Sequence, residues 1–101
     1  MNQNRKEVYY LLDSQSRQTK AIEKLINEFA LMLPSHFGEA YFVPSPMESL
    51  PSVLRANCSN PKCSVRAIVH LERGENGVLR IKEERPLFDR FSNACELCKE
   101  L

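Results

Sequence analysis

Four cysteines, arranged as two short pairs, constrain this chain more than any other feature of its sequence. Four residues separate Cys58 from Cys63, two separate Cys95 from Cys98, and the chain has no other cysteine. Each pair can present two sulfurs on one side of a tight turn, and two such pairs supply the four thiolates of a tetrahedral Zn²⁺ site. We therefore expect one structural zinc ion, bound by Cys58, Cys63, Cys95 and Cys98.

Other uses of these cysteines are possible in principle. Four thiolates also suit iron, so an iron or iron–sulfur site is the chemical alternative to zinc. Four unrelated buried thiols are the simplest alternative, but two local pairs with no stray cysteine argue against it. His36 is a candidate fifth ligand, although four cysteines already complete a tetrahedron and an ordinary loop histidine is the simpler interpretation.

The length of 101 residues supports a single domain over 1–101 with a modest core. Aromatic residues make up only 8% of the chain, so a metal ion is expected to add stability. The first residues lack the apolar core of a signal peptide, and no apolar run approaches the ~20 residues that cross a bilayer. We expect an intracellular, cytoplasmic protein without membrane association, or a nuclear one if its source is a eukaryote.

Residues 5–33 carry an apolar stripe with helical spacing, which predicts a long amphipathic N-terminal helix that ends before Pro34. A polar run over 13–19 interrupts the stripe, so a helical hairpin remains the alternative. The stripe is expected to pack either on the rest of the chain or on a second copy in a homodimer. Its members are Val8, Leu11, Leu12, Ile22, Leu25, Ile26, Phe29, Met32 and Leu33.

The segment 34–57 holds four of the six prolines. It predicts a connector with two short strands, over 40–43 and 52–56. The chain is therefore expected to reach the first cysteine pair as a strand.

After the first pair, apolar and polar residues alternate over 65–72, which predicts a half-buried strand. The turn Gly74–Gly77 and the segment 78–82 predict an antiparallel partner strand. Facing Leu71 with Leu79, and Val69 with Ile81, keeps the apolar side chains together. The other face then presents a candidate partner-binding set: Arg66, His70, Arg80 and Lys82.

Pro86 is expected to stop the second strand, and Ser92 or Asn93 to cap a short turn or helix that carries the second cysteine pair. The predicted fold class is therefore α+β, with a long N-terminal amphipathic helix or helical hairpin and a small zinc-bound β-hairpin unit. Because structural zinc contributes ~10 kcal/mol in small fingers, chelation or Cys63→Ser is expected to unfold residues 58–101.

The order of these elements, a strand, a cysteine knuckle, a hairpin and a second cysteine pair, resembles the zinc-ribbon and treble-clef classes of zinc finger over residues 58–101. In a ribbon the second pair lies on another knuckle, whereas in a treble clef it lies in the first turn of a helix. Both remain open. Small proteins of these classes are often found in the transcription apparatus, so the resemblance implies a regulator that acts on that machinery through protein–protein contacts.

Two other functions are considered, direct DNA or RNA binding and a homodimeric adaptor that uses the N-terminal helix. The formal net charge is +1, and four thiolates with one Zn²⁺ bring it to about −1, so the chain lacks the basic excess that bulk phosphate attraction requires. Acidic residues also interleave with the basic ones on the hairpin, a pattern typical of ion pairs on a solvated face.

Catalysis is not expected, and no catalytic residue is assigned. A zinc ion with four cysteine ligands has no open position for an activated water. The pattern His70-Leu71-Glu72 followed by Cys95 and Cys98 matches the outline of zinc deaminases, but it would leave Cys58 and Cys63 without a role.

Overall fold

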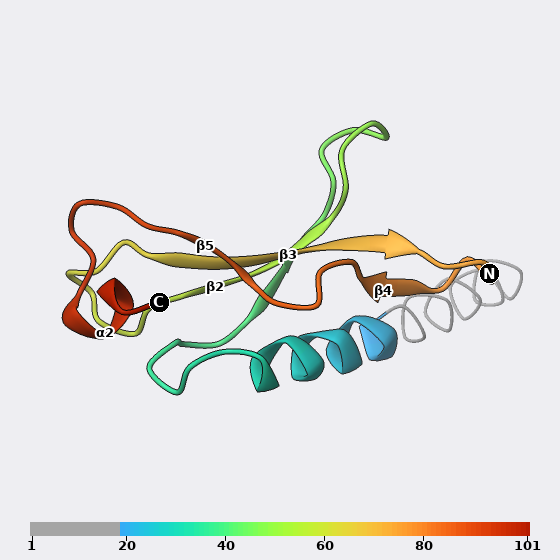
Figure 1. The fold of residues 1–101 in the computed structure, drawn as a ribbon. Coiled ribbons are helices and arrows are strands. Elements are labelled where there is room, and N and C mark those ends of the chain that lie inside the picture. Colours follow the sequence, from blue (N-terminus) through green and yellow to red (C-terminus); the bar gives the residue numbers. More distant parts are fainter. Residues whose placement is uncertain (1–18) are drawn as a thin grey trace, which may run out of the picture.

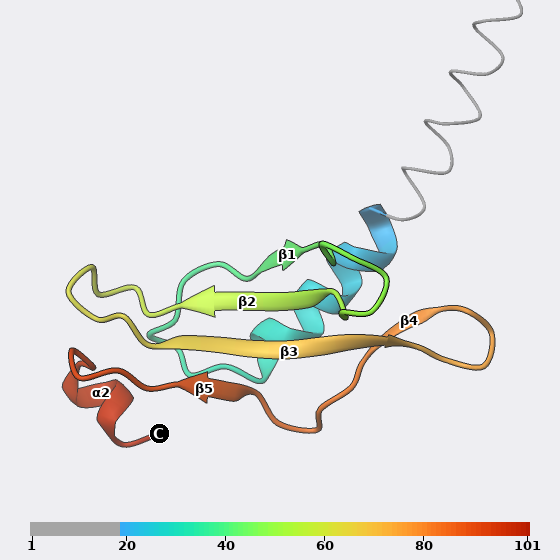
Figure 2. The same cartoon turned by 90° about the horizontal axis from the view of Figure 1, so that it is seen from above.

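The computed structural model describes residues 19–101, and the fold is α+β with one small antiparallel sheet (Figures 1 and 2). A helix occupies residues 19–31. It is followed by β1 (Tyr41–Val43), β2 (Val53–Asn57), β3 (Arg66–Arg73), β4 (Leu79–Ile81), β5 (Leu87–Asp89) and α2 (Glu96–Lys99).

The long strand β3 organises the sheet. Its neighbour on one edge is β2, which in turn pairs with the edge strand β1. Its other edge is shared: β5 pairs with residues 66–68 and β4 with residues 71–73. One strand therefore connects the end of the sheet that carries the cysteines to the end that carries the hairpin turn.

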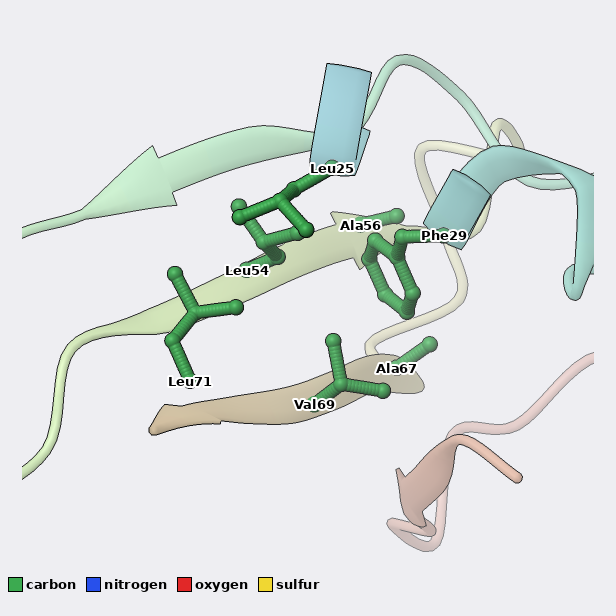
Figure 3. Packing of buried hydrophobic residues seen from close by; sticks show 7 residues of the cluster. All are labelled: Leu25, Phe29, Leu54, Ala56, Ala67, Val69 and Leu71. Carbon is green, nitrogen blue, oxygen red and sulfur yellow. The ribbon is translucent and has the colours of Figure 1, made fainter. Parts of the chain in front are cut away.

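The N-terminal helix covers one face of the sheet, because the spacing of its apolar residues places Leu25 and Phe29 on the same side (Figure 3). They pack on alternate residues of β2 and β3, which share one face of the sheet. These are Leu54, Ala56, Ala67, Val69 and Leu71, all buried. The result is a two-layer core, and full burial of Phe29 contributes about 3 kcal/mol.

The predicted helix over 5–33 is supported only in part. Residues 19–31 are helical, and the last turn tightens as Met32 and Leu33 donate backbone hydrogen bonds to Phe29 and Ala30 before Pro34. The single long helix is not supported, because its first part, with Val8, Leu11 and Leu12, lies outside the described residues.

The described members of the predicted helix stripe pack inside the chain. Leu25 and Phe29 are buried, Ile22 is partly buried, and Ile26, Met32 and Leu33 pack against the helix–sheet core. The large apolar side chain that the helix does expose is Leu31, at 88%. Packing within the chain is therefore the interpretation that agrees with these contacts.

The hairpin turn lies where the sequence predicts it, but the predicted register is wrong by two residues. Leu71 faces Ile81, and Leu79 faces Arg73. The turn closes with hydrogen bonds from Gly77 N–H to the Gly74 carbonyl and from Gly74 N–H to the Val78 carbonyl. Gly77 has φ +74°, and this left-handed conformation suits the last residue of a three-residue loop. The loop is therefore centred on Asn76. The same side chains still face the core, because a shift of two preserves the faces.

The strand β5 was not predicted. Pro86 does not simply end the hairpin, because the next three residues return to β3 as a strand. Phe88 on this strand packs against the helix–sheet core and lies 5.8 Å, between ring centroids, from Phe37. β5 therefore brings the chain back toward the first cysteine pair before α2 begins.

Candidate metal centre

The three chain segments that form the candidate metal centre are held together by backbone hydrogen bonds. Phe37 forms an isolated bridge with Cys58, and the N–H of Ser59 donates to the carbonyl of His36 at 2.9 Å. The N–H of Cys58 donates to the carbonyl of Val65 at 3.2 Å, which closes the loop containing Cys63. The loop after the helix is thus fixed against the first cysteine pair.

The second cysteine pair is attached to the first. Ser64 Oγ donates to Asn93 Oδ1, and the N–H of Cys95 donates to Cys63 Sγ at 3.2 Å. Cys95 is the N-cap of α2 and Cys98 lies within that helix, so neither Ser92 nor Asn93 caps it as predicted. Asn93 instead accepts the hydrogen bond from the first loop, and the cap position falls on a cysteine.

Four donor atoms in this region lie within 4.8 Å of one another, close enough to bind one metal ion. They belong to His36, Cys58, Cys95 and Cys98. Cys63 adjoins this group, since it is buried in the same cluster as Cys58 and Cys98 and its sulfur accepts a hydrogen bond from the N–H of Cys95. Five candidate ligands therefore converge, one more than a tetrahedral site uses.

The sulfurs of Cys58, Cys95 and Cys98 all lie within 4.8 Å of one another. Cys58 Sγ and Cys95 Sγ are 3.7 Å apart. A zinc ion with Zn–S bonds of about 2.3 Å places its sulfurs about 3.8 Å apart along each edge of the tetrahedron. The separation of Cys58 and Cys95 is therefore the one expected of two zinc ligands.

Burial and hydrogen bonds shift the pKa values of Cys58, Cys63 and Cys98 in different directions. It raises the pKa of Cys98, which is fully buried, and contact with the other three sulfurs raises that pKa further. Burial also raises the pKa of Cys58. It opposes ionisation of Cys63 too, but backbone N–H groups of Val65 and Cys95 outweigh it and lower the pKa of that thiol to about 7. Four thiolates cannot gather here without a cation that compensates their charge.

The predicted partner-binding set is largely paired with carboxylates. Arg66 Nη2 lies 3.1 Å from Asp89 Oδ2, and Arg80 Nε lies 3.0 Å from Glu72 Oε1. Glu83 accepts hydrogen bonds from the backbone and from the ring Nδ1 of His70. Lys82 follows β4 and is exposed. The strand pairing brings Arg66 and His70 to the sheet face opposite the helix, but each of these side chains already has a carboxylate partner.

Sequence reasoning missed a row of residues on that same open face. Tyr41, Arg55, Ile68 and Leu87 are directly opposed across β1, β2, β3 and β5. Tyr41 and Leu87 are exposed, and no carboxylate among residues 19–101 forms an ion pair with Arg55. The sequence carries no clear pattern for β5, and Leu87 joins this row only through the pairing of β5 with β3. We call these four residues the open-face row.

No family model, curated protein or solved structure matches this chain. None of the helices in the described part is long and apolar enough to cross a membrane. Fold and site together define an α+β protein with a cluster of sulfur and imidazole donors that can bind a metal ion.

Proposed function

We propose that this chain is a non-enzymatic binding protein, stabilised by one zinc ion, that engages a protein partner through the open face of its sheet. The gathering of the four cysteines in one cluster, with the sulfurs of Cys58, Cys95 and Cys98 within 4.8 Å of one another, carries the metal assignment. Zinc prefers such a donor set, and four thiolates close the coordination sphere, so the ion is structural. The cap position of Cys95 and the helical position of Cys98 favour a treble-clef arrangement over a ribbon.

The open-face row supports a protein partner. In this row Tyr41 and Ile68 flank Arg55, and the exposed Leu87 follows Ile68. The Nε of Arg55 is buried and has no hydrogen-bond partner among the described residues. Charge and apolarity together fit a segment that presents apolar side chains beside a carboxylate. The pairing of Arg66 and Arg80 with carboxylates argues against nucleic acid, because phosphate would have to compete for both cations.

The narrower expectation, a partner in the transcription machinery, rests on the zinc-finger resemblance alone and stays a prediction.

Metal content gives the first test. We expect native mass spectrometry of the purified chain, with elemental analysis, to find one zinc ion per chain, and a Cys63→Ser variant to bind zinc more weakly. A purified chain that carries no metal, or that carries iron, would overturn the zinc assignment.

Peptide selection tests the surface. A displayed library of extended peptides, selected against the zinc-loaded chain, is expected to yield peptides that combine a carboxylate with apolar residues. Their binding should be lost in Arg55→Glu and kept in Arg85→Glu, an exposed arginine outside the strands. Binders that ignore Arg55→Glu would place the surface elsewhere, and salt-sensitive retention on heparin would favour nucleic acid instead.

A further inference from the structure

Five candidate ligands for four positions leave one group with another role. We propose that His36 is not a metal ligand: its Nε2–H donates a hydrogen bond to the Cys98 thiolate and holds that sulfur in place for the metal. This inference rests on the metal site proposed above and assigns the role of one residue beside it.

The distance between His36 Nε2 and Cys98 Sγ distinguishes a hydrogen-bonding imidazole from a metal-binding one. His36 Nε2 lies 3.2 Å from Cys98 Sγ. If both atoms bound one zinc ion, at about 2.0 Å for nitrogen and 2.3 Å for sulfur, the tetrahedral angle would keep them about 3.5 Å apart. The observed separation is shorter than that edge and suits an N–H···S hydrogen bond. The sulfur pair Cys58 and Cys95, in contrast, has the separation expected of two ligands.

Cys63 is available as a fourth sulfur in place of the nitrogen. It is buried in the same cluster as Cys58 and Cys98, and Cys95 packs against that cluster. Its sulfur accepts a hydrogen bond from the backbone N–H of Cys95 at 3.2 Å, which favours the thiolate that a metal requires. A site that used His36 as its fourth ligand would leave this buried sulfur beside the ion without a role.

The backbone around His36 is fixed well enough for a positioning role. Its carbonyl accepts hydrogen bonds from the N–H and the Oγ of Ser59, at 2.9 and 2.6 Å. Two residues on, the N–H of Gly38 donates to the carbonyl of Asn57 at 2.8 Å. The ring also lies 4.8 Å, between centroids, from the ring of Phe37. The backbone that carries the imidazole is therefore fixed to the end of β2 and to the first cysteine pair.

The consequence of this hydrogen bond concerns Cys98, the most deeply buried of the four sulfurs. A donor that points at a thiolate withdraws part of its negative charge, and it orients the sulfur before the metal arrives. His36 also links the loop after the N-terminal helix to α2, since 62 positions separate the two residues in the sequence.

The test begins with the unmodified protein. X-ray absorption at the zinc edge of the zinc-loaded chain is expected to give four sulfur neighbours and no nitrogen. Three sulfurs and one nitrogen would overturn the role of His36 and leave the metal site intact. A chain that binds no metal would overturn both proposals, so the two failures are distinguishable.

Variants then measure the contribution of the hydrogen bond. His36→Phe keeps a ring but removes the donor, and it is expected to weaken zinc affinity about 10- to 100-fold in competition with a chelator, with four sulfur neighbours retained. His36→Gln keeps an N–H and should lose less. His70→Phe, a histidine paired with Glu83 away from the sulfurs, serves as the matched control. Equal affinity of His36→Phe and the unmodified chain would overturn the proposal.

Discussion

Glu83 occupies a gap in the sheet, between the end of β4 and the start of β5. At this point of β3 the carbonyl of His70 accepts a hydrogen bond from Lys82 N–H, but no strand supplies an acceptor for the His70 N–H. The Glu83 carboxylate fills that place: Oε2 accepts from the backbone N–H at 2.7 Å, and Oε1 lies 2.6 Å from ring Nδ1. One side chain thus replaces a missing strand carbonyl.

Removal of this carboxylate is expected to weaken the sheet. Burial acts to raise the pKa of Glu83, but the side-chain and backbone hydrogen bonds from His70 outweigh it, so the pKa lies below its ordinary value of 4.5. Glu83→Gln keeps the shape and loses the charge, and we expect it to cost about 1 to 2 kcal/mol of unfolding free energy at neutral pH. Denaturant unfolding measures the loss, with Glu84→Gln at an exposed neighbouring position as the control.

The pH dependence of that loss has a definite sign. A carboxylate whose pKa is depressed in the folded state contributes its full stabilisation above its unfolded value of about 4.5, and it loses this stabilisation as the pH falls through the lower folded value. The difference between Glu83→Gln and the unmodified chain should therefore shrink below pH 4.5. A difference that stays constant down to pH 3 would contradict the ion pair.

Among the elements, the N-terminal helix and the sheet depend on each other through Phe29 and Leu25. Phe29 is fully buried against β2 and β3, so Phe29→Ala is expected to cost about 3 to 5 kcal/mol of unfolding free energy. Leu31→Ala, on the exposed side of the same helix, should change stability by less than about 0.5 kcal/mol. Thermal unfolding of both variants provides the comparison, and equal losses would mean that the helix does not pack as described.

Elements with a strong local pattern could be predicted from the sequence, and those that depend on tertiary pairing could not. The alternation over 65–72 predicts β3 because its period of two is visible in the chain itself. β5 is only three residues long and is a strand because Phe88 packs into the core beside β3. The hairpin register depended on which glycine adopts the left-handed conformation, and Gly74 and Gly77 cannot be told apart by composition.

The residues of the candidate site also fall into those with a local sequence signal and those that depend on tertiary contacts. The spacing of the two cysteine pairs predicts that they meet, because short pairs are a local signal, and Cys58, Cys95 and Cys98 do lie within 4.8 Å of one another, together with His36. His36 comes to Cys98 only through the bridge between Phe37 and Cys58, a contact with no local signature. Arg55 was missed for a similar reason, since its place on the open face depends on pairing with both β1 and β3.

At the scale of the whole molecule, two buried clusters lie side by side, and Phe37 packs against both. One cluster is the helix–sheet core, and the other contains Cys58, Cys63, Val65 and Cys98. The inner residues of β3, Ala67, Val69 and Leu71, belong to the helix–sheet core. A metal ion bound at the cysteines would therefore stabilise one end of the sheet directly and the remainder through β3.

Metal removal should consequently have a local effect. The sequence led us to expect that chelation would unfold residues 58–101, but the membership of β3 in the helix–sheet core limits the expected loss to the loop 58–64 and the segment 93–99. Amide hydrogen exchange before and after chelation tests this, with protection expected to persist at Leu54 and Val69. Loss of protection throughout β2 and β3 would show that the sheet cannot stand without the metal.

The separation of the ligands along the chain has a consequence for the lifetime of the folded state. Cys58 and Cys95 are 37 positions apart, and we expect them to meet only after the intervening strands have paired, because closing so long a loop earlier costs entropy that no contact yet offsets. Interactions that form after the folding transition state mainly slow unfolding. Stopped-flow measurements should therefore find that zinc slows the unfolding rate and leaves the refolding rate nearly unchanged. A zinc-dependent refolding rate would place the site in the folding nucleus. On this view the ion forms its bonds after the transition state of folding, and it lengthens the time between spontaneous openings of the chain.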